Sequence, residues 1–144
     1  MKVKIKEGPL AGQIGQAVVV YYDVQHTGNG PDLCLVGVGD DVNAEMLSTE
    51  LEIIEQPEPE NKMVGRDEDG REVHGGDLVA WRNTILVVEW NRVEGDWQLR
   101  RVEGHYAYPT IRHLGDMRVV GLVAGLTDGD KLREIERAWK EINQ

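Results

Sequence analysis

The chain has little of the side-chain chemistry on which many hydrolases and extracellular proteins depend. It contains one cysteine, Cys34, and one serine, Ser48, in 144 residues. A single cysteine excludes an intramolecular disulfide and favours a reducing compartment. Cys34 lies in the apolar run LCLVGV and is expected to be a small buried hydrophobe. Ser48 has no nucleophile-elbow sequence around it.

Long apolar segments and the common catalytic motifs are also missing. No apolar run approaches the ~20 residues of a membrane helix, and the start, MKVKIKEG, lacks the apolar core of a signal peptide. We therefore expect a cytoplasmic protein with no membrane partner. Phosphate-binding loops, dinucleotide fingerprints, paired cysteines and zinc-protease motifs are absent. We expect a non-enzymatic protein without a cofactor.

Two histidines are the best candidates if the chain does bind a metal or catalyse a reaction. His105 and His113 precede Asp116 in the aromatic segment GHYAYPTIRHLGD. Their spacing is irregular and no third strong ligand is close in sequence. We interpret them as loop histidines and predict no metal site.

Charge is distributed unevenly along the chain, whose net charge is −10. Residues 1–62 hold 4 Lys and no Arg against 11 acidic residues, a net charge of −7. Residues 63–144 hold 12 basic and 15 acidic residues, a net charge of −3, and all arginines and tryptophans. This shift, together with the sequence QPEPENK, predicts an acidic, proline-containing linker at residues 56–62.

The first 55 residues have the pattern of a small β unit. Strands are expected at Lys2–Lys6, Ile14–Val24, Leu33–Val38 and Leu51–Ile54, with a turn at Gly39–Asn43. The alternation of lysine with Val3 and Ile5 is typical of a strand with one buried face. Short strands at this density predict a barrel of SH3 type over residues 1–55.

The opening IKEGPLAGQIGQAVVV resembles a KOW motif. The resemblance depends on Gly8, Pro9, Leu10, Gly12, Gly15 and the following valines. It implies contact with RNA, DNA or a partner protein through the loop between the first two strands. That loop, residues 7–16, has no Lys or Arg, and phosphate affinity comes largely from cations. Charge therefore disfavours nucleic acid as the partner of this half.

Residues 63–126 read as a meander of short strands. Asp69-Gly70 suits a tight hairpin turn, because glycine adopts positive φ without steric cost. The segments Leu78–Trp81, Ile85–Trp90 and Trp97–Val102 are rich in β-branched and aromatic residues, and Met117–Ala124 is the expected last strand.

This half is similar to the YopX family of small phage and prophage proteins. The matching residues are Gly70, Glu72, Gly76-Asp77, Val88-Glu89-Trp90 and Val119-Val120-Gly121. After the last glycine the chain departs from the family pattern, with Leu122-Val123-Ala124 in place of the family's usual ending. The resemblance implies a β-barrel-like fold over residues 63–126 and a phage or prophage setting. It implies no catalytic mechanism.

The sequence pattern of residues 127–144 predicts an amphipathic helix. Leu132, Ile135, Trp139 and Ile142 recur three or four residues apart and form one apolar stripe. We favour a stripe that covers the open end of the second unit. The alternative is that Trp139 and Ile142 dock on another subunit or a partner.

Tryptophan and arginine in the second half are the strongest binding signal, because both are typical of binding hot spots. The candidate partner-binding residues are Trp81, Arg82, Arg92, Arg100, Arg101, Trp139 and Ile142. The competing interpretation, which we favour for Trp81, Trp90 and Trp97, is that the tryptophans fill the core.

The sequence therefore predicts a mainly β protein: two small SH3-like or barrel-like units and a C-terminal helix. The leading functional hypothesis is a non-enzymatic phage or prophage accessory protein that binds a host or phage protein, or a second copy of itself, in the bacterial cytoplasm. One alternative is a nucleic-acid-binding regulator using the KOW-like unit or the arginines. Another is an acidic first half that imitates DNA.

Overall fold

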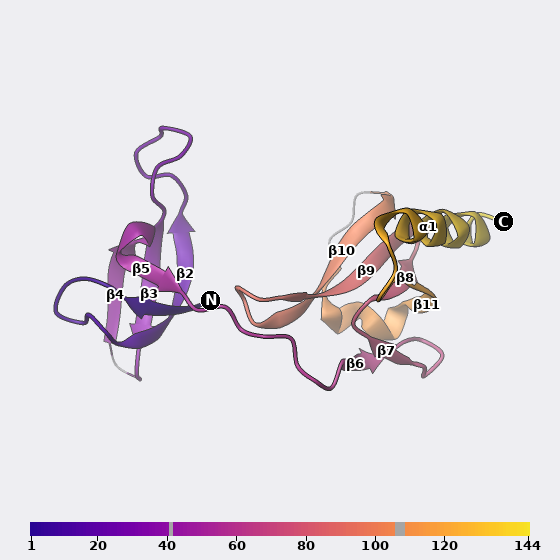
Figure 1. Ribbon diagram of the computed structural model, residues 1–144, viewed down its shortest axis with the longest axis horizontal. Coiled ribbons are helices and arrows are strands. Elements are labelled where there is room, and N and C mark those ends of the chain that lie inside the picture. Colours follow the sequence, from indigo (N-terminus) through magenta and orange to yellow (C-terminus); the bar gives the residue numbers. More distant parts are fainter. Residues whose placement is uncertain (41, 106–108) are drawn as a thin grey trace. The chain divides into compact units, whose positions relative to one another are not determined.

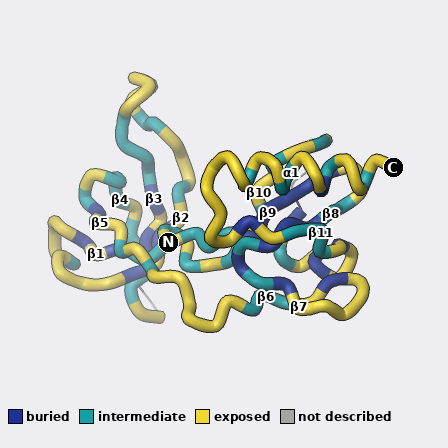
Figure 2. Tube along the Cα trace, turned by 45° about the vertical axis from the view of Figure 1, so that its right-hand side comes forward, coloured by how far each residue is buried: buried dark blue, intermediate teal, exposed yellow. Residues whose placement is uncertain are grey.

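The computed structural model describes residues 1–40, 42–105 and 109–144, and these residues form two compact units. Unit 1 comprises Met1–Pro57 with Arg92–Gly95, and unit 2 comprises Glu58–Asn91 with Asp96–Gln144. Figure 1 labels the helix and the strands other than β1, which Figure 2 labels. Each unit has its own hydrophobic clusters, so each is described separately.

Unit 1 is a five-stranded antiparallel sheet. Its strands are β1 (Lys2–Ile5), β2 (Ile14–Tyr21), β3 (Leu33–Val38), β4 (Val42–Leu47) and β5 (Leu51–Ile53), in the order β4-β3-β2-β1-β5. A short 3-10 turn, η1 (Ser48–Glu50), joins β4 to β5. Alternate residues of β1, β2 and β3 face one core, which contains Val3, Ile5, Ala17, Cys34, Val36 and Leu51. Period-two alternation thus gives the sheet one buried and one exposed face.

Unit 2 is built on a four-stranded antiparallel sheet with the order β10-β9-β8-β11. Its strands are β8 (Asp77–Trp81), β9 (Thr84–Asn91), β10 (Asp96–Gly104) and β11 (Arg118–Leu122). A hairpin of β6 (Met63–Arg66) and β7 (Glu72–His74) and a 3-10 helix, η2 (Ile111–Asp116), complete the β part.

The two central strands of unit 2 are buried on both faces. Val79 and Leu86 pack in one cluster with Val73 and Met117, from β7 and the residue after η2. Leu78 and Ile85 point to the opposite side and pack in a second cluster with residues of the C-terminal helix. Burial on both faces explains why β8 and β9 have nearly continuous apolar runs instead of alternation. Figure 2 shows the buried residues concentrated on these strands.

The helix α1 (Asp128–Ile142) covers one face of this sheet. The side chain of Thr127 accepts a hydrogen bond from the Asp130 amide and caps the helix N-terminus. Ile135, Trp139 and Ile142 pack against the same cluster as Leu78 and Ile85. No helix within the described residues has the length and apolar character needed to cross a membrane.

The prediction of a mainly β protein with a C-terminal helix is confirmed. The assignment of either unit to an SH3-like or YopX-like fold stays a prediction, as do the boundaries at residues 55, 62 and 126.

Two local predictions for unit 1 were wrong. The strand that begins at Ile14 ends at Tyr21 instead of Val24, because the chain turns at Asp23, which has a φ of 46°. The expected turn at Gly39–Asn43 was too long, because Val42 and Asn43 belong to β4 and pair with β3.

Candidate functional site

Trp81 and Arg82 lie together at the end of β8. Arg82 is exposed and its guanidinium carbon lies 4.5 Å from the centre of the Trp81 ring. Trp81 is half-buried, packs on the Val79–Leu86 cluster and lies 6.0 Å from the His113 ring, centre to centre. Arg82 has a φ of 56°, a left-handed conformation that glycine adopts more easily. The cation–π contact is worth about 0.5–1 kcal/mol at an exposed site.

The other candidate arginines each have different local contacts from Arg82. Arg100 forms a two-bond ion pair with Glu89 across β9 and β10, at 2.7 and 2.9 Å. The Glu89 carboxylate raises the pKa of Arg100. Arg101 donates to the Gly104 carbonyl, and Arg92 lies exposed in the turn between β9 and β10. Arg100 is thus engaged within its own sheet.

Trp139 and Ile142 are packed against the sheet of unit 2, as described above. The exposed apolar residue of α1 is Leu132, with 69% of its surface accessible. The geometry therefore supports a covering role for Ile135, Trp139 and Ile142, and we do not carry Trp139 and Ile142 forward as a docking site. Leu132, predicted in the same stripe, is exposed and does not cover the sheet.

The three candidate metal or catalytic residues, His105, His113 and Asp116, are all exposed. His113 Nδ1 accepts a hydrogen bond from the Thr110 amide at 3.0 Å, which closes the first turn of η2. Nowhere in the described ranges do three His, Cys, Asp or Glu side chains lie close enough together to hold a metal ion.

The feature that the sequence did not predict is the edge of the unit 1 sheet at β4, one of its two edge strands. Strand β4 ends the sheet and pairs only with β3 among the described residues. The Ser48 amide donates to the Asp32 carbonyl, and the register continues with Cys34 opposite Met46. Because hydrogen-bonded and non-hydrogen-bonded pairs alternate along antiparallel strands, Met46 and Ala44 bond to β3 through their main chain. The main-chain groups of Asn43, Glu45 and Leu47 therefore face away from β3.

One of these outward groups already has a partner. The Leu47 amide donates to the Glu50 carboxylate at 3.1 Å. Within the described part of the chain, the outward amides of Asn43 and Glu45 have no such bond. The edge is thus closed at Leu47 and open over the two preceding outward positions.

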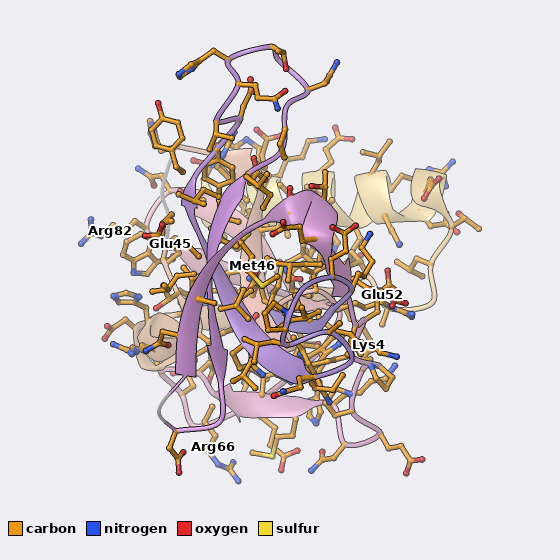
Figure 3. All side chains as sticks on the ribbon, turned by 90° about the vertical axis from the view of Figure 1, so that its left-hand side faces the viewer. Lys4, Glu45, Met46, Glu52, Arg66 and Arg82 are labelled. Carbon is orange, nitrogen blue, oxygen red and sulfur yellow. The ribbon has the colours of Figure 1, made fainter. Side chains whose placement is uncertain are left out.

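A groove of about 610 Å³ lies along this edge. It is bounded by β4 and by the loop between β1 and β2. Most residues of this loop are exposed (Figure 2). Its apolar lining comes from Pro9, Leu10, Ala44 and Met46. Leu10 and Met46 also pack on the core of unit 1, and this packing holds the two side chains of the groove floor in place. Figure 3 shows Glu45 and Met46 at neighbouring positions of the strand.

Carboxylates supply the charge of the groove. Glu7, Glu45 and Glu50 line it, and among the residues that the structure describes no lysine or arginine does. None of the three forms an ion pair with a side chain in the described ranges. The groove therefore combines an apolar floor, an unpaired strand edge and uncompensated negative charge.

The sequence contained one signal for this site. The resemblance to a KOW motif implies contact through residues 7–16, and residues 7–10 of this segment form one wall of the groove. The other wall was missed because β4 was not predicted as a strand.

Comparison with protein-family models, curated proteins and solved structures finds no match for this chain.

Proposed function

We propose that the chain is a non-enzymatic accessory protein that binds a protein partner through the groove beside β4. The observation that carries this proposal is the open edge of β4, which lies in a groove with an apolar floor. Such edges are templates for another chain, and natural proteins usually cover, shorten or block them. The groove also lies in the size range of about 300–1,000 Å³ that is typical of binding sites.

The chemistry of the groove favours binding over catalysis. Among the described residues, the ionisable side chains that line it are carboxylates on an open surface, and neither a nucleophile nor a histidine lines it. The resemblance to YopX proteins supports a phage or prophage setting, in which the partner is a host or phage protein of the bacterial cytoplasm.

Site-specific photo-crosslinking tests this function. A photoreactive residue replaces Leu10 or Met46, and in a control protein it replaces the exposed Leu132 of α1. We expect a defined bacterial protein to be linked from the groove positions in a nuclease-treated lysate, and not from position 132. The purified protein should then bind with a fixed stoichiometry and lose affinity for the Glu45→Lys variant. Equal linking from all positions would contradict the proposal.

The second candidate function is nucleic-acid binding, and the exposed Arg82–Trp81 stack is the observation that favours it. Stacked aromatic and guanidinium groups contribute to single-strand binding. This candidate predicts an affinity for labelled single-stranded DNA or RNA that falls steeply with salt and is lost in Arg82→Ala. No binding at low salt would exclude it.

A further inference from the structure

We propose that the partner presents an extended segment in which cationic and apolar residues alternate, and that this segment adds to the free edge of β4 as an antiparallel strand. The proposal rests on the proposed function, because it specifies what the groove holds and how.

The main chain of β4 supplies the first argument. Asn43 and Glu45 both direct an N–H and a C=O group away from β3, and they lie two residues apart. Two residues along a strand span about 6.8 Å. A second strand also directs its N–H and C=O groups to one neighbour at every second residue, so its hydrogen-bonding groups have the same spacing. A helix has no free main-chain groups to match it. The Glu50 carboxylate caps the Leu47 amide and marks the end of the usable edge.

Charge selects a cationic segment and argues against a second copy of this chain. In an antiparallel β4–β4 pair, the Glu7, Glu45 and Glu50 side chains of one copy would approach those of the other. Like charges directly opposite each other destabilise a sheet, and opposite charges stabilise it. A lysine or arginine opposite Glu45 therefore fits the groove better than the chain's own edge.

The pleat of the sheet explains why cationic and apolar residues should alternate in the bound segment. Glu45 points to the exposed face of β4, and Met46 and Ala44 point toward the core side. Directly opposite residues of antiparallel strands share a face. A residue opposite Glu45 thus projects beside a carboxylate, and its neighbour projects over the apolar floor of Met46 and Leu10. The expected segment has about four to six residues, since β4 has 6 residues and strands of this length are typical.

N-methylated peptides test this arrangement without changing the protein. The probe is an eight-residue peptide of alternating lysine and valine, blocked at both ends and titrated by calorimetry. In the proposed register the lysine amides face β4 and the valine amides face solvent. We expect methylation of the lysine amides to weaken binding at least about tenfold, since it removes the peptide's main-chain hydrogen bonds to β4. Methylation of the valine amides should change affinity by less than about threefold.

Two variants separate the strand edge from the charge. Glu45→Gln removes only the charge, and we expect weaker binding that depends less on salt. Glu45→Pro also removes the outward amide and keeps the bonds between β3 and β4, because proline is tolerated where an edge N–H faces solvent. It should bind more weakly than Glu45→Gln. If circular dichroism shows that the proline variant is unfolded, the methylated peptides alone test whether the main chain of β4 binds the segment.

The outcomes distinguish this inference from the proposed function. Strand addition is overturned if both methylated peptides bind as well as the parent, or if neither binds. It is also overturned if the parent does not bind, or if a glutamate–valine peptide binds equally well. If the crosslinked partner still loses affinity for Glu45→Lys in any of these cases, the function stands and the strand-addition mode fails. If groove crosslinking also fails, both are wrong.

Discussion

Asp67 shows how a single buried side chain organises unit 2. Its carboxylate accepts hydrogen bonds from the amides of Asp69 and Arg71 in the turn after β6, and from Val119 on β11. Only 5% of the residue is exposed. Burial raises the pKa of Asp67, but the amide donors of Val119, Arg71 and Asp69 together outweigh this effect and hold the pKa below its ordinary value. The carboxylate thus joins a local turn to a distant strand.

Replacing Asp67 with alanine is therefore expected to destabilise unit 2 strongly. Three amides in partly buried hydrogen bonds would lose their acceptor, and a group left unsatisfied in a buried position costs about 1–3 kcal/mol. We expect a loss of about 2–3 kcal/mol in the free energy of unfolding, measured by urea denaturation. The adjacent exposed acid provides a control, because Glu68→Ala should change stability by less than about 0.5 kcal/mol. Equal effects of the two substitutions would contradict the role assigned to Asp67.

Asp77 is a buried carboxylate with the opposite pH behaviour. Burial raises its pKa, although the His74 amide, which donates to it at 2.8 Å, opposes the shift. Ionisation therefore costs more in the folded state than in the unfolded state. Asp67, whose pKa is lowered, stabilises the fold above the ordinary aspartate pKa of about 4 and loses this contribution as pH falls through its folded pKa. Asp77 destabilises the fold as pH rises above about 4.

This difference gives a paired prediction. Asp77→Asn keeps an acceptor for the His74 amide and removes the buried charge, so it should raise the unfolding free energy at pH 7 and have little effect at pH 3. Asp67→Asn should lower the unfolding free energy at pH 7, and this deficit should shrink toward pH 3. Denaturation of both variants at the two pH values measures the contrast. Parallel pH profiles would contradict it.

At the scale of elements, α1 illustrates a helix held by packing. Trp139 packs in the cluster of Leu78 and Ile85, whereas Leu132 is exposed on the same helix. We expect Trp139→Ala to cost about 2–4 kcal/mol, as for a large side chain removed from a partly buried site. Leu132→Ala should cost less than about 0.5 kcal/mol. Thermal unfolding followed by circular dichroism measures both, and a large loss for Leu132 alone would contradict the assigned packing.

The elements that could be predicted from sequence are those whose pattern reflects burial. The apolar runs of β8 and β9 and the apolar stripe of α1 predict their structures directly. Gly70, with a φ of 76°, lies in the predicted turn between β6 and β7.

Strand β4 could not be predicted in the same way. Its sequence VNAEML contains asparagine, alanine and glutamate, which are depleted in strands. It is a strand because β3 supplies its hydrogen bonds, a tertiary effect that local propensity does not contain. The groove was missed for the same reason. The Arg100–Glu89 ion pair was also missed, because spacing along the sequence did not reveal that β9 and β10 place the two side chains opposite each other; the arginines as partner-binding residues stay a prediction.

At the scale of the whole molecule, the two units have cores with no residue in common. All 4 tryptophans belong to unit 2, so tryptophan fluorescence reports on unit 2, whereas circular dichroism reports on both units. We expect Val36→Ala, in the core of unit 1, to lower the stability of that unit by about 2 kcal/mol. Circular dichroism should detect this loss, and the fluorescence midpoint should stay unchanged. A matching shift in fluorescence would contradict separate cores.

The most direct test of the account is amide hydrogen exchange of unit 1 with and without the lysine–valine peptide. Asn43 and Glu45 direct their amides to the open edge, whereas the Ala44 and Met46 amides already bond to β3. We predict that the peptide slows exchange at Asn43 and Glu45 and leaves Ala44 and Met46 nearly unchanged. Unchanged exchange at Asn43 and Glu45 under saturating peptide would contradict the central claim that β4 is a docking edge.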